Sequence, residues 1–390
     1  MNIICVLMYL YLFLKPYYLF KSGGIQISDI FLIVAFIFML LTKNNKKVIK
    51  DIVNHNIQML FFLVFVIIIN VLYYIVFLNS KFLISTIYFV FIFIAILLFE
   101  YILENNNVVF LEKIDRIFKV NIIIQFFIAI LGIGRYYDSS RYMGTFNDPN
   151  QFGFYILLSL FFLFFYAVSK KKSFVLYYLL CLYLIIRSAS TGMLLSFAIF
   201  TILYIVYYLK SKNFKMVIRN FPIYLIIIAT IILVLLIIIN SNPRIKEKID
   251  NVQYISFVMN RIFDKFDRME ATTDTNTMSI FEERGYDKLF NYPQYLLFGA
   301  GEGNYSRFMD NSVVGEIHAT LPSILFYYGL LPTIILVKWI LNNIKNIDKK
   351  YFIVFIALLI ESFTLLNQRQ VLFWIIILVA KYYDKLEKEK

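Results

Sequence analysis

The sequence predicts an all-α polytopic membrane protein with about twelve transmembrane helices and one large extracytoplasmic loop. Of its 390 residues, 61% are apolar and only 16% are charged, whereas about half of the residues in a soluble domain are apolar. The apolar residues fall into runs bounded by charge, and a membrane-spanning helix needs about 20 of them. One long segment, residues 241–317, interrupts these runs. This composition excludes a soluble enzyme.

The apolar runs predict the helices in chain order. They cover residues 3–20, 27–42, 57–78, 83–102, 120–134, 151–169, 174–187, 191–209, 221–240, 318–340, 351–366 and 371–382. No small-residue cleavage site follows the first run, so we expect it to be retained as a helix. Residues 104–119 have the pattern of an amphipathic helix lying on the cytoplasmic face. Three parts follow: a bundle at 1–240, the loop at 241–317, and a last bundle with a tail at 318–390.

The formal net charge of +13 reflects orientation more than binding partners. Lysine and arginine gather in alternate loops, such as 43–50, 113–119, 170–172 and 210–219, and in the C-terminal tail after residue 381. The loops between them hold few. Because basic residues favour the cytoplasmic side, we predict that both termini are cytoplasmic and that 241–317 faces outward. We expect no nucleic-acid partner.

The outer loop has the pattern of a small folded element. Apolar residues recur every three or four positions over 243–269, and a second helix is predicted from Ser279 to Tyr292. The stretch 299–303, Gly-Ala-Gly-Glu-Gly, follows no predicted strand. We interpret it as a tight turn rather than a phosphate-binding loop.

The first candidate site is residues 141–150, Arg-Tyr-Met-Gly-Thr-Phe-Asn-Asp-Pro-Asn. Pro149 removes a backbone donor, and we expect Asn150 to cap the following helix. A plain loop-to-helix transition would also explain this end of the segment. Arg141 is a guanidinium predicted at the membrane surface, which suits a phosphate or pyrophosphate. Asn147 and Asn150 are candidate substrate-binding residues.

Two further candidates lie in or beside the outer loop. Arg284 follows two glutamates, and an ordinary surface salt bridge is the alternative explanation. His318 precedes a predicted helix and would be suited to act as a general base near neutral pH, although a single histidine is more often structural. The other histidine, His55, lies among polar residues, and we interpret it as a solvated side chain.

Intramembrane charge marks the remaining candidates. Glu361 lies in a predicted helix with Arg369 at its outer end, and Arg187 ends another helix. Charged groups at such depth usually face the bundle and are paired. These residues would line a polar cavity or form structural ion pairs.

Motifs for several other functions are missing from the sequence. It contains no Walker A motif, no Asp-x-Asp pair and no His-Glu-x-x-His motif, which are typical of an ATPase pump, a nucleotide-sugar enzyme and a zinc protease. The two cysteines, Cys5 and Cys181, lie in apolar runs and suit buried packing. We expect neither a metal site nor a cofactor.

Together these features resemble the superfamily of O-antigen polymerases and O-antigen ligases. Its Arg-x-x-Gly-Thr-Phe-x-x-Pro-Asn signature matches residues 141–150. The other matching segments follow in the same order: Ser188–Gly192, the Ser279–Arg284 helix, Pro293–Gly303, and His318 with Tyr328–Leu331. Two positions depart from the family pattern. Ala319 replaces an asparagine, and Thr191 replaces an arginine whose place Arg187 would take.

The resemblance implies a bacterial inner-membrane glycosyltransferase of GT-C-like architecture, acting at the periplasmic or exterior face. Its donor would be an oligosaccharide on undecaprenyl pyrophosphate, transferred with inversion and without a metal. Arg141, Arg284 and Arg187 would hold the pyrophosphate, and His318 would deprotonate the acceptor. Glu361 and Arg369 would contact substrate. Membrane lipid and a chain-length regulator protein are the other partners it implies.

Three functions remain open at this stage. A polymerase would extend another carrier-linked repeat unit of O-antigen or capsule, whereas a ligase would transfer the glycan to the lipid A core of lipopolysaccharide. The weaker match at Ser190–Thr191 and at His318–Ala319 favours the polymerase. A lipid-linked oligosaccharide flippase, a transporter, would instead need charges along a central path. The sequence gathers its candidate charges at the outer face.

Overall fold

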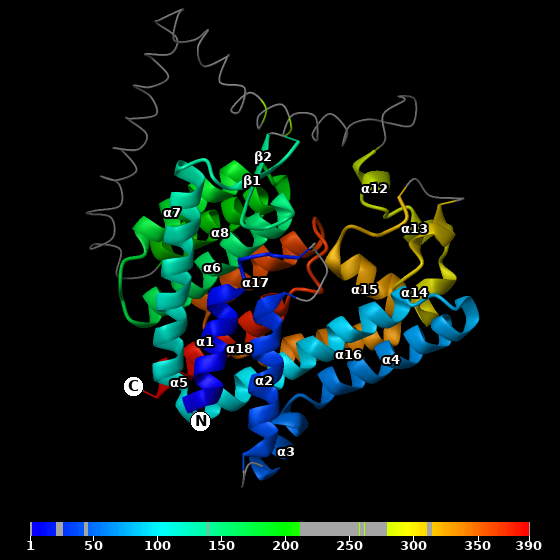
Figure 1. Ribbon diagram of the computed structural model, residues 1–390, viewed down its shortest axis with the longest axis horizontal. Coiled ribbons are helices and arrows are strands. Elements are labelled where there is room, and N and C mark those ends of the chain that lie inside the picture. The colour runs from blue at the N-terminus through cyan, green and yellow to red at the C-terminus, as the bar shows by residue number, and fades with distance from the viewer. Residues whose placement is uncertain are drawn as a thin grey trace, which may run out of the picture.

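The computed structural model describes residues 2–20, 26–42, 46–138, 140–210, 257, 261, 279–309 and 314–389. Within these residues the chain is mostly α-helical, with one small β-hairpin (Figure 1). The predicted span at 221–240 and the predicted helix at 243–269 lie outside the described residues.

Three described helices are long and apolar enough to cross a membrane, judged by length and composition. They are α4 (Ile57–Phe77), the part Lys81–Asn105 of α5 (Lys81–Ile130), and α6 (Pro149–Ser169). Shorter apolar helices accompany them. This architecture is consistent with an all-α membrane protein.

The helices α4 and α6 bury their apolar residues to very different extents. In α6, 94% of the most apolar window is buried inside the protein, against 22% in α4. A helix that is apolar all round and buried belongs to the core, and α6 packs against α5, α7 (Val175–Ser188) and α18 (Val371–Lys388). The exposed apolar surface of α4 is of the kind that lipid, rather than water, would cover.

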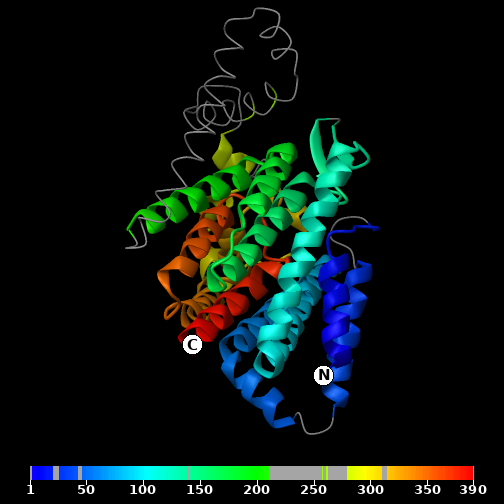
Figure 2. The ribbon, with the colours of Figure 1, turned by 90° about the vertical axis from the view of Figure 1, so that its left-hand side faces the viewer.

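The first two helices form a pair at one edge of the molecule (Figure 2). Helix α1 (Asn2–Leu14) is shorter than the predicted 3–20 run, because Pro16 disfavours helical geometry in the residue before it. Helix α2 (Ile27–Leu41) begins with a capping box, in which the Gln26 backbone N–H donates to Asp29 Oδ2 at 2.9 Å.

The region between the predicted second and fifth spans differs from expectation. An additional amphipathic helix, α3 (Lys46–His55), precedes α4. The two predicted spans at 83–102 and 120–134, with the predicted interfacial helix between them, form the single helix α5. A straight helix of this length would be about 75 Å long, more than twice the thickness of a bilayer core. Figure 1 shows that α5 changes direction, its first part beside α4 and its later part standing upright.

The second half of the bundle closes around α6 and α18. Helix α8 (Thr191–Lys210) packs on α17 (Lys349–Ser362), where Ser196 Oγ donates to the Ala357 carbonyl at 2.7 Å. The predicted 318–340 span is two helices, α15 (Thr320–Tyr328) and α16 (Leu330–Ile344). Gly329 separates them with φ of +79°, and a Cβ there would lie 2.6 Å from the Leu297 carbonyl oxygen.

The described part of the outer loop consists of short helices. The predicted Ser279–Tyr292 helix is interrupted: α12 (Ile280–Glu283) ends at a turn with Gly285 at φ of +72°, and α13 (Lys288–Asn291) follows. After these come α14 (Gln294–Phe298) and the 3-10 helix η1 (Tyr305–Phe308).

A cluster of polar side chains ties four helices together far from the outer loop. His55 is paired with Glu100 through Nδ1, and its Nε2 lies 2.7 Å from Lys381 Nζ. Asn56 also donates to Glu100, and Trp339 Nε1 donates to Asn56 Oδ1 at 2.9 Å. His55 is exposed, as expected for a solvated side chain, but it also has a partner, because Glu100 from a distant stretch of sequence pairs with its ring.

Candidate functional site

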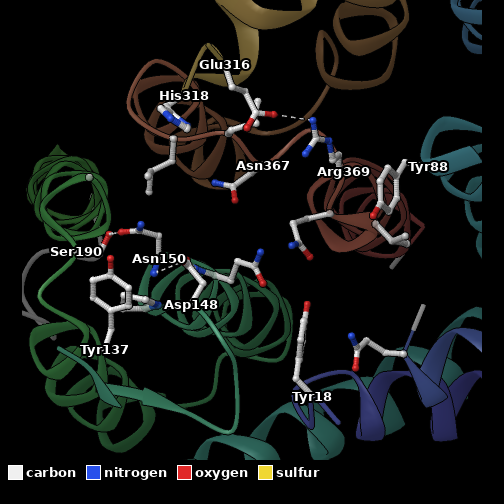
Figure 3. A pocket seen from close by; sticks show the side chains of 18 of the residues that line it. Tyr18, Tyr88, Tyr137, Asp148, Asn150, Ser190, Glu316, His318, Asn367 and Arg369 are labelled. Atoms are coloured by element: carbon white, nitrogen blue, oxygen red, sulfur yellow. Dashed lines mark hydrogen bonds and ion pairs between the residues drawn. The ribbon is translucent and has the colours of Figure 1, made fainter. Parts of the chain in front are cut away.

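One cavity of about 960 Å³ lies where the ends of several elements meet. Five residues singled out in the sequence line it: Arg141, Asn150, Arg284, His318 and Arg369. Figure 3 shows Asn150, His318 and Arg369, from three separate elements, around the same space. Segments far apart in the chain therefore contribute to one site, which we call the central cavity.

A β-hairpin places Arg141 in the cavity wall. Strand β1 (Arg135–Tyr137) pairs antiparallel with β2 (Arg141–Gly144). This hairpin was not predicted, since two strands of three and four residues leave little periodicity to read. The Arg141 guanidinium donates to Asn150 Oδ1 at 2.8 Å and to the Ser188 carbonyl at 3.3 Å.

The start of α6 presents Asn150 to the cavity, although Asn150 does not cap the helix. The cap is Asp148, whose Oδ1 accepts from the backbone N–H groups of Asn150 and Gln151 at 2.8 and 2.9 Å. Pro149 then occupies the first helical position, where its missing N–H costs nothing. The Asn150 side chain is left to accept from both Arg141 and Ser190 Oγ, the latter at 2.9 Å.

His318 and Arg284 are held together through the backbone. The His318 N–H donates to the Arg284 carbonyl at 2.9 Å, and the Ile317 N–H donates to Tyr327 Oη at 3.2 Å. The His318 ring makes no hydrogen bond or ion pair with any other described residue. Burial, together with the positive charge of Arg284, lowers its pKa below the ordinary value of 6.5. His318 is consequently a neutral imidazole at pH 7.

Arg284 is partly buried, and the charge of Glu283, which raises the pKa of Arg284, offsets only part of the effect of burial. Its guanidinium forms no ion pair within 4 Å in the part of the chain that the structure describes, so the simple salt bridge to a neighbouring glutamate is not observed. Burial lowers the pKa of Arg284, and Arg261 nearby acts in the same direction. Arg261, which the sequence analysis did not single out, also lines the cavity, as does Glu283. Two partly buried guanidinium groups beside one cavity favour binding of an anion.

Arg369 has a different role, because it is bound to carboxylates of the protein. It donates to Glu302 Oε1 at 2.6 Å through Nη2 and to Glu316 Oε1 at 2.7 Å. Tyr305 Oη accepts a third bond at 2.6 Å. Burial would lower the pKa of Arg369, but Glu302, Tyr305 and Glu316 together raise it. Arg369 therefore anchors the cavity wall as a cation already engaged by the protein.

The glycine-rich stretch 299–303 holds Glu302, the carboxylate that binds Arg369. The N–H groups of Ala300 and Gly301 donate to the carbonyls of Phe326 and Tyr327 at 3.0 and 2.9 Å. The Glu302 N–H donates to Asn70 Oδ1 at 2.9 Å, which leaves these three amides engaged. The stretch is a tight turn that buries Glu302, in keeping with its interpretation from the sequence. The anionic partner of Arg369 is what the sequence analysis missed.

Three predicted site residues do not line the cavity. Arg187 donates to Tyr136 Oη at 2.8 Å and lies over the ring of Tyr142. Asn147 donates to the Phe20 carbonyl at 2.6 Å. Glu361 is fully buried and accepts from Asn367 Nδ2, and Asn367 rather than Glu361 lines the cavity.

The sequence analysis also missed an ion pair in the wall formed by α1 and α2. Lys15 Nζ lies 3.0 Å from Asp29 Oδ1, and the two residues are 9% and 8% exposed. Both line the cavity with Tyr18 and Tyr88. A lysine and an aspartate fourteen positions apart give no periodic signal, so only their shared burial identifies them.

One side of the cavity is apolar and open to the surroundings of the bundle. Ile33 of α2 and Ile84 and Ile87 of α5 line it, and they are 41%, 49% and 60% exposed. The cavity could therefore bind an amphiphilic ligand, with its apolar part against the isoleucines and its charged part at the arginines.

The arrangement provides cations for an anion, an uncharged imidazole for a proton, and hydrogen-bonding groups for a polar ligand. Among the described residues, no three His, Cys, Asp or Glu side chains gather in a way that would hold a metal ion. Comparison of the sequence with models of protein families and with curated proteins finds no match.

Proposed function

We propose that this protein is a membrane glycosyltransferase that polymerises oligosaccharide repeat units carried on undecaprenyl pyrophosphate. The observation that carries the proposal is the meeting of Arg141, Arg284 and His318 at one cavity. The sequence resemblance implies this chemistry, and the geometry supports it by bringing the matching residues together. The finer architecture belongs to the same proposal: about twelve spans, a GT-C-like arrangement, both termini cytoplasmic, and the cavity at the outer face of the bacterial inner membrane.

The reaction needs a stabilised leaving group and a proton acceptor. The acceptor hydroxyl oxygen attacks the anomeric carbon of the donor sugar, and the bond from that carbon to the pyrophosphate oxygen breaks with inversion. The electron pair leaves with the pyrophosphate, whose added charge Arg284 and Arg141 stabilise. Arg261 adds a third guanidinium. The hydroxyl proton passes to the neutral ring of His318, whose lowered pKa keeps it able to accept a proton at pH 7.

The apolar side of the cavity supports a lipid-linked substrate. Ile33, Ile84 and Ile87 are exposed and lie beside the charged residues. A polyprenyl chain could remain in the bilayer against this side while its pyrophosphate head reaches the arginines. A water-soluble nucleotide sugar would gain nothing from such a surface.

The test is deletion of the gene, followed by electrophoresis of the glycolipids. We expect the deletion strain to carry only single repeat units, and expression of the wild-type protein to restore long chains. Long carrier-linked chains that never reach the lipid A core would overturn the polymerase and favour the ligase. Single units trapped on the cytoplasmic side would favour the flippase. Arg284→Ala should fail to restore polymer at wild-type protein level, and full restoration would refute the assigned site.

A further inference from the structure

Five polar residues that line the cavity, Lys15, Tyr18, Asp29, Gln151 and Gln370, form what we call the neutral wall. In Figure 3, Tyr18 lies across the cavity from His318. The proposed transfer needs two substrates in one cavity, and the arginines account for the pyrophosphate of only one of them.

The neutral wall carries no net charge. The ammonium of Lys15 and the carboxylate of Asp29 neutralise one another at 3.0 Å. Tyr18 and Gln370, which share a hydrogen bond, are uncharged, as is Gln151. A second pyrophosphate would gain little from this surface. Sugar hydroxyls, each of which both donates and accepts, match a surface that presents fixed donors beside fixed acceptors.

The neutral wall also has hydrogen-bonding capacity that the described residues do not use. Lys15 is 9% exposed and donates to Asp29 Oδ1 at 3.0 Å, and its ammonium group also lies over the ring of Tyr11. Gln151 Oε1 is buried and has no hydrogen-bond partner among the described residues. Buried polar atoms are nearly always satisfied by protein, water or ligand. Both residues line the cavity, so a polar ligand there would complete their bonding.

The neutral wall is fixed relative to the arginine side. The Tyr18 N–H donates to the Thr145 carbonyl at 3.2 Å, and Thr145 Oγ1 donates back to the Pro16 carbonyl. Thr145 lies between the hairpin that carries Arg141 and helix α6, which also carries Gln151. A ligand bound at the neutral wall and a second ligand bound at Arg141 would therefore be held at a fixed distance and orientation. Such positioning is a main requirement for a reaction between two substrates.

We propose that the neutral wall is the acceptor subsite, binding an uncharged sugar of the acceptor glycan so that its hydroxyl group points toward His318. The proposal rests on the proposed function and adds to it the location and chemistry of the second substrate. Lys15 donates to a sugar hydroxyl, Gln151 Oε1 accepts from another, and Tyr18 supplies an aromatic ring. The donor remains on the arginine side.

The key variant is Gln151→Met, because the orphaned Oε1 makes no bond that folding would lose. The probes are the repeat-unit oligosaccharide, freed from its carrier by mild acid, and inorganic pyrophosphate, each titrated into the full-length protein in nanodiscs. The free oligosaccharide lacks a pyrophosphate and can bind only as an acceptor. We expect Gln151→Met to weaken oligosaccharide binding about tenfold and pyrophosphate binding less than about twofold.

Two further variants complete the design. Arg284→Ala should show the reverse pattern, weakening pyrophosphate and sparing the oligosaccharide. Gln58→Met, the same exchange at a half-buried position on α4 outside the cavity lining, removes a bond from Asn342 but no cavity group; it is the control and should change neither. The double variant Lys15→Met/Asp29→Leu removes both charges together, so neither is left buried alone, and it should also lose the oligosaccharide selectively.

The results separate this inference from the proposed function. If the wild-type protein does not bind the oligosaccharide, or if Gln151→Met weakens both probes equally or neither, the neutral wall is not the acceptor subsite. The proposed function would still stand if Arg284→Ala abolished polymer in cells. If Arg284→Ala leaves polymer intact, the proposed function fails, whatever the oligosaccharide does.

Discussion

His318 and His55, the two histidines of the chain, lie toward opposite ends of the bundle. Helix α4 spans the distance between them, starting beside His55 and reaching the outer loop, where Tyr73 Oη donates to the Gly299 carbonyl at 3.0 Å. Both rings are partly exposed, and both have carboxylates in their vicinity. Their bonding is nevertheless very different.

At His55 both ring nitrogens are engaged, one by buried Glu100 and the other by Lys381. At His318 neither ring nitrogen bonds to another described residue, while the backbone on both sides of the ring is held firmly. A histidine with both nitrogens bonded can hold helices together but has no free position for a substrate proton. A histidine that is fixed by its backbone and open at its ring can accept one.

The largest difference should come from removing each ring in turn. We expect His318→Ala to lower kcat by about 10²–10⁴-fold, the usual contribution of a general base, with little change in the amount of folded protein. His55→Ala should leave kcat within about threefold. The measurement is polymer formation from purified lipid-linked repeat units in proteoliposomes. Comparable rates for the two variants would remove the contrast on which the assignment of His318 depends.

The two variants should also differ in stability, with the larger loss now in His55→Ala rather than in His318→Ala. Removing His55 leaves the buried carboxylate of Glu100 without one partner, and the ring is 42% exposed at its side chain. We therefore expect a loss of about 1–3 kcal/mol, less than for a fully buried pair. Thermal unfolding in detergent should show a midpoint several degrees lower. His318→Ala serves as the control and should unfold near the wild-type temperature.

The sequence predicted the parts of this contrast that depend on local pattern. Apolar runs long enough for a bilayer located most of the described helices, since both lipid and the protein core require apolar side chains over that length. The Arg141–Asn150 segment, Arg284 and His318 were identified as chemical candidates, and the structure brings residues from all three to one cavity.

What the sequence could not predict depends on contacts between distant segments. Gly329 divides a predicted span because the Leu297 carbonyl approaches it closely. Glu100 gives the exposed His55 a partner that the local sequence does not reveal, and Lys15 meets Asp29 because α1 packs on α2. Such pairings leave no trace in periodicity.

A third test uses the charge of Glu316, which raises the pKa of His318 against the larger effect of burial. Because the pKa of His318 is lowered, its contribution to stability is fully present above its ordinary pKa of 6.5 and is lost, together with activity, as pH falls from there through the lowered pKa. Glu316→Gln should lower this pKa again and move the acid limb of kcat/KM to lower pH. Arg369 keeps Glu302 as a partner. Glu387→Gln, which alters only a distant pair with Lys350, should leave the limb in place.

The smallest effect is expected at Arg187. Its substitution tests whether an arginine close to a predicted motif, but outside the cavity lining, contributes to activity. Arg187 lies close to the small-polar segment and is as good a phosphate ligand by type as Arg141. The structure directs it to Tyr136 and Tyr142 instead, outside the cavity lining. We expect Arg187→Ala to reduce kcat/KM by less than about threefold, because it removes a guanidinium that packs on aromatic rings. A loss as large as that of Arg284→Ala, measured in the same proteoliposomes, would mean that Arg187 turns toward the pyrophosphate once substrate binds.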